Sequence, residues 1–207
     1  IALATAVAVW AGVTIVRAHP IDWEAYQTGE KELGIVDERE FWTLAVGREL
    51  TDPPRYAEDF LGSKLMQNWE DALDKGTDAD AAQLNLAYVS ADPEIYSWYY
   101  RDREEDASDL SNLPLTAYLI NLGMTSMNAP LDVRILDTVG LATPIAARMP
   151  RDPKGRVGHD KFLDPAWQAA DTDTYLDGLP PFISSMRAKQ ARAALRSPEI
   201  SELLATS

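Results

Sequence analysis

The first sixteen residues contain no charged side chain, and this run constrains the fold more than any other feature of the sequence. The run, IALATAVAVWAGVTIV, ends abruptly at Arg17, His19 and Pro20. Sixteen helical residues rise about 24 Å, a little less than the roughly 30 Å hydrocarbon layer of a bilayer. Because the chain begins with Ile rather than Met, we expect it to continue upstream. The run then predicts a single transmembrane anchor helix over residues 1–17.

Two other interpretations of this run stay open. It is also compatible with the apolar region of a signal peptide, or with a buried β-strand, because it is rich in β-branched residues. If it is an anchor, Trp10, Trp23 and Tyr26 are expected at the membrane interface, where amphipathic aromatic side chains prefer to lie. No second apolar run approaches spanning length, so the sequence predicts at most a single-pass protein.

The residues that follow the run are acidic, with seven carboxylates between positions 22 and 40. Arg17 is the nearest cation, so the positive-inside rule disfavours a cytosolic position for this flank. We therefore expect the body of the protein on the periplasmic or an equivalent extracytoplasmic side of the membrane. The chain has no cysteine, which excludes thiolate nucleophiles, iron–sulfur clusters and Cys-ligated zinc.

The sequence of residues 18–207 predicts an irregular multi-helix globular domain with long loops. The expected fold class is therefore all-α. Proline, Asp and Ser residues suit the first turns of helices over 52–75 and 181–196, and of shorter helices that open at Asp37, Asp78, Pro93 and Pro114. Alternating strands joined by Asn-Gly or Asp-Gly turns are not found, which argues against a sheet. The polar stretch at 150–166 predicts a long loop.

The formal net charge of −14 argues against a nucleic-acid partner, because sequence-independent binding requires a supply of cations. Residues 51–110 hold most of this acidic excess. The C-terminal helix reverses it, and helical spacing places Lys189, Arg192 and Arg196 on one stripe. We expect this stripe either to be a solvated helix face or to contact an acidic partner or anionic lipid headgroups.

Local motifs for catalysis are missing from the sequence. It lacks GxSxG, SxxK, GxxxxGK[ST] and GxGxxG, so no catalytic residue, cofactor or metal is predicted. His159, beside Asp160, is expected to be a surface histidine, with a ligand-binding or general-base role as the alternative. Asp171, Asp173 and Asp177 superficially resemble a calcium loop, but the glycine and the twelfth position do not fit an EF-hand.

An apolar leader, many aromatic residues and no catalytic motif together favour a non-catalytic membrane-anchored accessory or scaffold subunit. Such a subunit belongs to a larger membrane complex of the respiratory, photosynthetic or secretion type, with other membrane subunits and membrane lipid as its partners. The first alternative is an anchored or secreted extracytoplasmic enzyme or ligand-binding protein that uses the 150–166 loop. The second is a soluble helical adaptor whose first segment is core.

Overall fold

The computed structural model describes residues 2–17, 37–105, 113–155 and 158–205. The chain divides into two compact units, Ile1–Asp37 and Glu38–Ser207. The first contains helix α1 (Ala2–Arg17), along which Val7, Trp10 and Val13 are exposed. Trp23 and Tyr26 lie outside the described residues. Within the described ranges, no helix combines the length and the apolar character needed to cross a membrane, which corrects the predicted N-terminal transmembrane helix.

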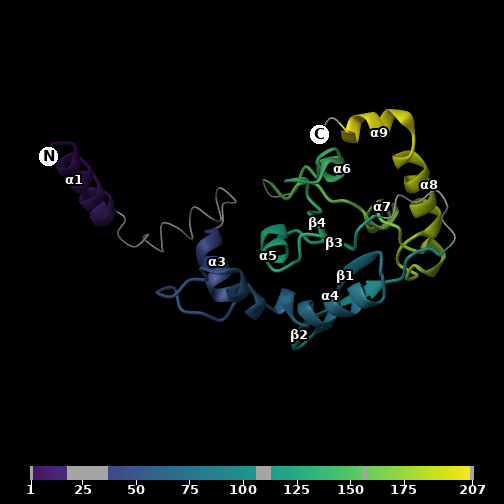
Figure 1. The fold of residues 1–207 in the computed structure, drawn as a ribbon, viewed down its shortest axis with the longest axis horizontal. Helices are drawn as coiled ribbons and strands as arrows, with labels where there is room; N and C mark the ends of the chain where they lie inside the picture. Colours follow the sequence, from purple (N-terminus) through teal and green to yellow (C-terminus); the bar gives the residue numbers. More distant parts are fainter. Residues whose placement is uncertain (1, 18–36, 106–112, 156–157, 206–207) are drawn as a thin grey trace. The chain divides into compact units, whose positions relative to one another are not determined.

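The second unit contains a four-stranded mixed sheet, so the all-α prediction is wrong (Figure 1). Its strands are β1 (Gln83–Ala91), β2 (Glu94–Arg101), β3 (Thr116–Tyr118) and β4 (Arg134–Leu136), in the order β2-β1-β3-β4. β1 and β2 pair antiparallel as a hairpin, while β1 with β3 and β3 with β4 pair parallel. The segments expected to form helices from Asp78, Pro93 and Pro114 therefore supply three of the four strands.

The hairpin forms because its side chains alternate between two environments. Leu84 and Trp98 are buried in the main core, while their neighbours Asn85 and Tyr99 point to the opposite face. This period of two is that of a strand, and the aromatic residues of β2 have high strand propensity. The turn between the strands contains Asp92 and Pro93 rather than an Asn-Gly pair, which is why a search for that pair does not find it.

The predicted helix over 52–75 is broken into three pieces. They are the 3₁₀ helices η1 (Ala57–Gly62) and η2 (Lys64–Met66) and helix α4 (Trp69–Asp78). The break before α4 lies at Asn68, whose φ of 53° is left-handed. The Asn68 amide donates to the Trp98 carbonyl oxygen (2.9 Å) and accepts from the Trp98 N–H (2.8 Å). Asn68 thus provides hydrogen-bond partners for the Trp98 backbone on the edge strand β2. Its left-handed conformation at the same time interrupts the helix.

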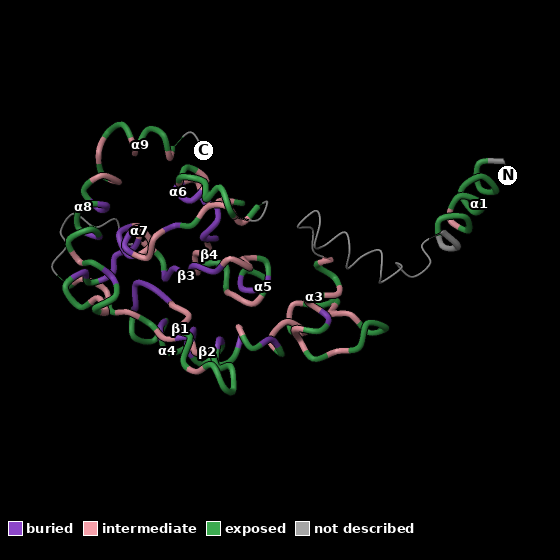
Figure 2. Tube along the Cα trace, turned by 180° about the vertical axis from the view of Figure 1, so that it is seen from behind, coloured by how far each residue is buried: buried purple, intermediate pink, exposed green. Residues whose placement is uncertain are grey.

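The main core lies between α4 and the sheet. Trp69 and Trp98 pack edge to face, with ring centroids 4.6 Å apart. Their indole N–H groups donate to the carbonyl oxygens of Asn128 (2.8 Å) and Leu65 (2.7 Å), so neither polar atom is buried without a partner. At Gly76 a side chain would lie only 3.2 Å from Leu84, which shows how closely the helix meets the sheet. Figure 2 shows the buried residues concentrated along the strands and their connections.

Short helices complete this unit, and two of them begin at side-chain caps. They are α3 (Glu38–Ala45), α5 (Leu122–Met127), α6 (Pro144–Ala147), α7 (Pro165–Ala170), η3 (Leu176–Gly178), α8 (Ser185–Leu195) and α9 (Pro198–Ala205). Asp164 accepts from the Ala166 N–H (2.8 Å) at the start of α7, and Ser184 from the Arg187 N–H (3.3 Å) at the start of α8. The described part of 150–164 has no helix or strand, and α7 begins at Pro165, inside the loop predicted over 150–166.

The turn after β4 is organised by one buried carboxylate, that of Asp137. Its two oxygens accept five backbone N–H groups, those of residues 139–143. Burial by itself would raise the pKa of Asp137, but the N–H donors of Ala142, Leu141 and Gly140 outweigh burial and lower it. Asp137 therefore stays ionised and holds the turn as a compact loop.

Replacing Gly140 by Ala should destabilise this loop. Gly140 has a φ of +91°, and an added Cβ would lie 2.4 Å from Ala147 Cα. We expect Gly140→Ala to lower the free energy of unfolding by about 2–4 kcal/mol, measured by chemical denaturation. Gly123→Ala is the control, because Gly123 lies in α5 with nothing within 4 Å of the added atom. Equal stability of the two variants would contradict this account of the loop.

Candidate functional site

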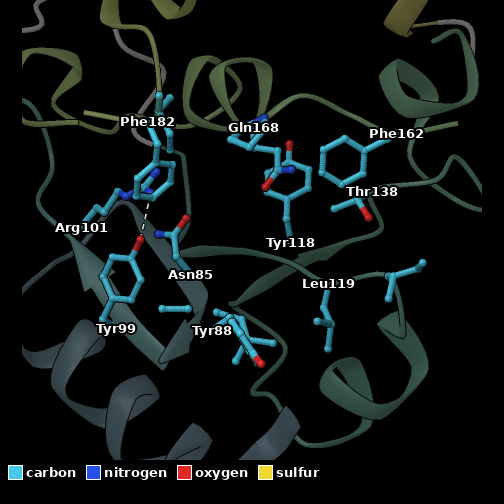
Figure 3. Close-up of a pocket in the computed structure, with 15 residues that line it drawn as sticks. Asn85, Tyr88, Tyr99, Arg101, Tyr118, Leu119, Thr138, Phe162, Gln168 and Phe182 are labelled. Atoms are coloured by element: carbon cyan, nitrogen blue, oxygen red, sulfur yellow. Dashed lines mark hydrogen bonds between the residues drawn. The ribbon is translucent and has the colours of Figure 1, made fainter. Parts of the chain in front are cut away.

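A cleft of about 520 Å³ lies on the sheet beside the C-terminal helices, and Figure 3 shows its lining. The floor comes from β1, β2 and β3, and the walls come from the turn after β4 and from the segments around α7 and before α8. The lining residues are Asn85, Leu86, Ala87, Tyr88, Tyr99, Arg101, Tyr118, Leu119, Ile120, Thr138, Phe162, Pro165, Gln168, Phe182 and Ile183. The cleft thus joins parts of the chain that are far apart in sequence.

One end of the cleft is polar and centres on Arg101. The guanidinium Nη2 donates to the Tyr99 hydroxyl (3.0 Å), and Nη1 donates to the Gln83 side-chain oxygen (3.3 Å). Its central carbon also lies 5.6 Å from the centre of the Tyr99 ring. These contacts hold the guanidinium in place, yet its Nε is buried and has no hydrogen-bond partner among the described residues. The same is true of Nδ2 of Asn85, on the neighbouring strand.

The other end of the cleft contains Tyr118, Gln168, Phe162 and Thr138 (Figure 3). The Tyr118 hydroxyl donates to the Asp171 carboxylate, which also accepts from Arg134 Nη2 at 2.7 Å. Burial, followed by the charge of Asp171, raises the pKa of Tyr118 well above its ordinary value. The phenol therefore stays protonated and fixed as a donor, so it is not available as a base.

The chemistry of the lining suits binding better than bond cleavage. Among the described residues that line the cleft, none is a carboxylate or a histidine, and the one charged side chain is Arg101. The remainder are aromatic rings, aliphatic groups, amides and hydroxyls. A concave surface of this composition, with a few fixed polar groups, is typical of a site for a small uncharged ligand.

The three cations predicted to share a stripe have different environments. Lys189 is exposed and pairs with Asp177 (2.6 Å), and Arg196 is exposed at the end of α8. Arg192 is only 7% exposed, so its guanidinium is not part of an exposed stripe. Contact of Lys189 and Arg196 with an acidic partner or lipid headgroups stays a prediction.

Arg192, on α8, links the segment after α7 to Glu104, which follows strand β2. Its Nη1 donates to Glu104 (2.6 Å), and its Nη2 donates to the carbonyl oxygens of Ala169, Thr172 and Thr174 at 3.3, 3.0 and 2.6 Å. The Thr174 hydroxyl in turn donates to Gln83, the residue that also holds Arg101. Arg192 is therefore a structural cation that fixes the segment after α7.

The remaining candidates from the sequence do not line the cleft. Asp160 pairs with Arg151, and Nδ1 of His159 is buried without a hydrogen-bond partner. The three aspartates of the calcium-like segment bind separate cations: Asp171 binds Arg134, Asp173 binds Arg103 and Asp177 binds Lys189. Within the described ranges, no group of three or more acidic or histidine side chains is arranged to hold a metal ion.

Sequence reasoning missed the residues of the cleft floor. The expected helices that open at Asp78 and Pro93 put Asn85 and Tyr99 on two separate elements, where they do not share the face of a sheet. The alternation of polar Gln83 and Asn85 with apolar leucines was the signal that could have found them. The walls carry no such local signal, because they approach the floor only through the tertiary fold.

Removal of the Arg192 side chain should destabilise the second unit strongly. Arg192→Met leaves Glu104 without its cation and three carbonyl oxygens without their donor. We expect the free energy of unfolding to fall by about 3–5 kcal/mol, measured by chemical denaturation. Lys189→Met, which breaks an exposed ion pair on the same helix, should have little effect. Equal and small losses in both variants would show that Arg192 has no structural role.

Comparison with known proteins gives a clear relationship. Residues 62–207 match the AftB family C-terminal domain. The chain is 44% identical over 202 residues to a terminal beta-(1->2)-arabinofuranosyltransferase of Corynebacterium glutamicum, covering 96% of this chain and 28% of that protein. It is 32% identical over 172 residues to the protein of that name from Mycobacterium tuberculosis, covering 80% of this chain and 26% of that protein. The chain thus spans about a quarter of each relative. No solved structure matches it.

These relationships correct the functional hypothesis drawn from the sequence. The relatives bear the name of a glycosyltransferase, an enzyme class, so the hypothesis of a non-catalytic accessory subunit is wrong. The expectation of a membrane protein is supported by the family, whereas a single-pass topology is not shown by the described helices. Since the family domain covers residues 62–207, well over half of the chain, the protein belongs to the AftB family.

Proposed function

We propose that this chain is part of an arabinofuranosyltransferase that adds terminal β-(1→2)-linked arabinofuranosyl residues. The observation that carries the proposal is the 44% identity over 96% of the chain with the Corynebacterium glutamicum enzyme of that name. The structure adds a cleft that is lined for binding and has no carboxylate or histidine among its described lining residues. We therefore assign the unit of residues 38–205 a part in holding a glycan substrate of the transferase.

A chimera tests this proposal. The matched region of the Corynebacterium glutamicum enzyme is replaced by this chain, and terminal β-(1→2)-arabinofuranosyl linkages are measured by linkage analysis in cells that lack the native enzyme. Because the two sequences correspond over nearly the whole chain, we expect the chimera to form these linkages. A second chimera, in which a flexible linker replaces the region, should form none. A chimera that is folded and expressed at the native level, yet forms no such linkage, would refute the proposal.

We further propose that residues 38–205 lie on the extracytoplasmic side of the membrane, as the acidic flank after residue 17 suggests. This chain has no cysteine, so a single introduced thiol is the one labelling site within it. Glu70 is exposed on α4, and Glu70→Cys should react with a membrane-impermeant maleimide in intact spheroplasts. The unchanged chain is the control for background labelling. Labelling of the variant only after lysis would place the unit in the cytosol.

A further inference from the structure

The cleft contains two buried hydrogen-bond donors that lack acceptors. Nδ2 of Asn85 and Nε of Arg101 belong to neighbouring strands, and both side chains line the cleft (Figure 3). A buried donor without an acceptor has lost its hydrogen bond to water and gained none in the protein, so native structures seldom leave two such donors in one place. Their position indicates a ligand that offers acceptor oxygens to both.

The aromatic side chains of the rim are unusually exposed. Phe182 is 79% exposed and Phe162 is 60% exposed, although both line the cleft. Exposed phenyl rings beside fixed polar groups are typical of a ligand site, because a bound molecule would cover their apolar surface. The electron-rich face of such a ring also attracts polarised C–H groups, which a sugar ring presents on one side.

The arrangement of Arg101 and the charge of the lining bear on the class of ligand. A phosphate or carboxylate is recognised through paired N–H donors of a guanidinium fork. Here Nη1 and Nη2 each use one of their two N–H groups on Gln83 and Tyr99, and Nε is the nitrogen that has no partner. The described lining contains no carboxylate that would attract a cation. An uncharged polyhydroxyl ligand fits both facts, and a volume of 520 Å³ is within the roughly 300–1,000 Å³ of small-molecule sites.

We propose that this cleft is a carbohydrate subsite that holds an arabinofuranosyl residue of a neutral glycan chain. The Asn85 amide and the Arg101 Nε donate to oxygens of the sugar, and Phe182 covers its apolar face. The cleft itself is assigned from its geometry, and the identity of the sugar rests on the proposed function. Asn85 and Arg101 then determine the orientation of the ring, while Gln83 and Tyr99 keep the guanidinium in position.

Direct binding tests the subsite without measuring transfer. The full chain in detergent micelles is titrated by calorimetry with a linear arabinofuranosyl hexasaccharide, with a xylo-oligosaccharide of equal length and with inorganic phosphate. We expect saturable binding of the arabinofuranosyl chain alone. Absence of binding would overturn the proposal. Equal binding of the xylo-oligosaccharide would overturn the arabinofuranosyl assignment, and binding of phosphate instead of sugar would identify an anion site.

Variants of the lining place the bound sugar. Asn85→Leu and Arg101→Met each remove the nitrogen that is assigned to the sugar and should weaken binding about tenfold, the effect of one lost hydrogen bond. Gln190→Leu and Arg55→Met are the matched controls, because both residues are exposed and outside the lining. Phe182→Ala should also weaken binding and leave the fold intact, since that ring is 79% exposed. Unchanged affinity in all three lining variants would overturn the proposal.

The two proposals fail in different ways. If the chimera is active but the present chain by itself binds no sugar, the subsite is overturned and the transferase assignment stays in place. If the chimera is inactive but the present chain still binds the arabinofuranosyl hexasaccharide through Asn85 and Arg101, the transferase assignment alone is overturned.

Discussion

The edge-to-face packing of Trp69 against Trp98 determines how the second unit is built. It joins α4 to the edge strand β2, and both indole N–H groups are satisfied by backbone carbonyls. Because successive side chains of a strand point to opposite faces, burying Trp98 against α4 turns Tyr99 and Arg101 toward the other face. Pairing of Asn85 with Tyr99 across the hairpin then brings the polar groups of the cleft together. The floor of the cleft is thus a direct consequence of the packing beneath it.

Local signals predicted part of this fold. The helix that starts near Asp37 is present, and the last long helix, expected over 181–196, is observed as α8 over Ser185–Leu195, because a helix start depends on a few neighbouring residues. The strands were missed for two reasons. The hairpin turn has an unexpected composition, and β3 and β4 contain three residues each, too few to show any periodicity. Asn68 also ended a long apolar pattern through a tertiary contact that no local rule contains.

The site was less accessible to prediction than the fold. Helical spacing places Lys189, Arg192 and Arg196 on one side of a helix. It cannot reveal that Arg192 donates to Glu104, which lies 88 residues earlier in the sequence. Burial of that cation follows from the tertiary structure alone. The cleft likewise consists of ordinary residue types without a catalytic motif, so its meaning depends on which side chains the fold brings together. The family was recognised from similarity spread over the chain rather than from any short pattern.

The cleft also has a consequence for synthesis of the protein. Its floor includes a hairpin with a two-residue turn, whereas Phe182 joins the lining about eighty residues after the hairpin ends. Neighbouring segments pair early at low entropic cost, while a long loop closes late. A chain emerging from the ribosome can therefore assemble the tryptophan core and the hairpin well before the opposite wall exists. Any nascent product that stops short of α7 would carry the floor with its aromatic face uncovered, a state that chaperones and proteases would recognise as unfinished.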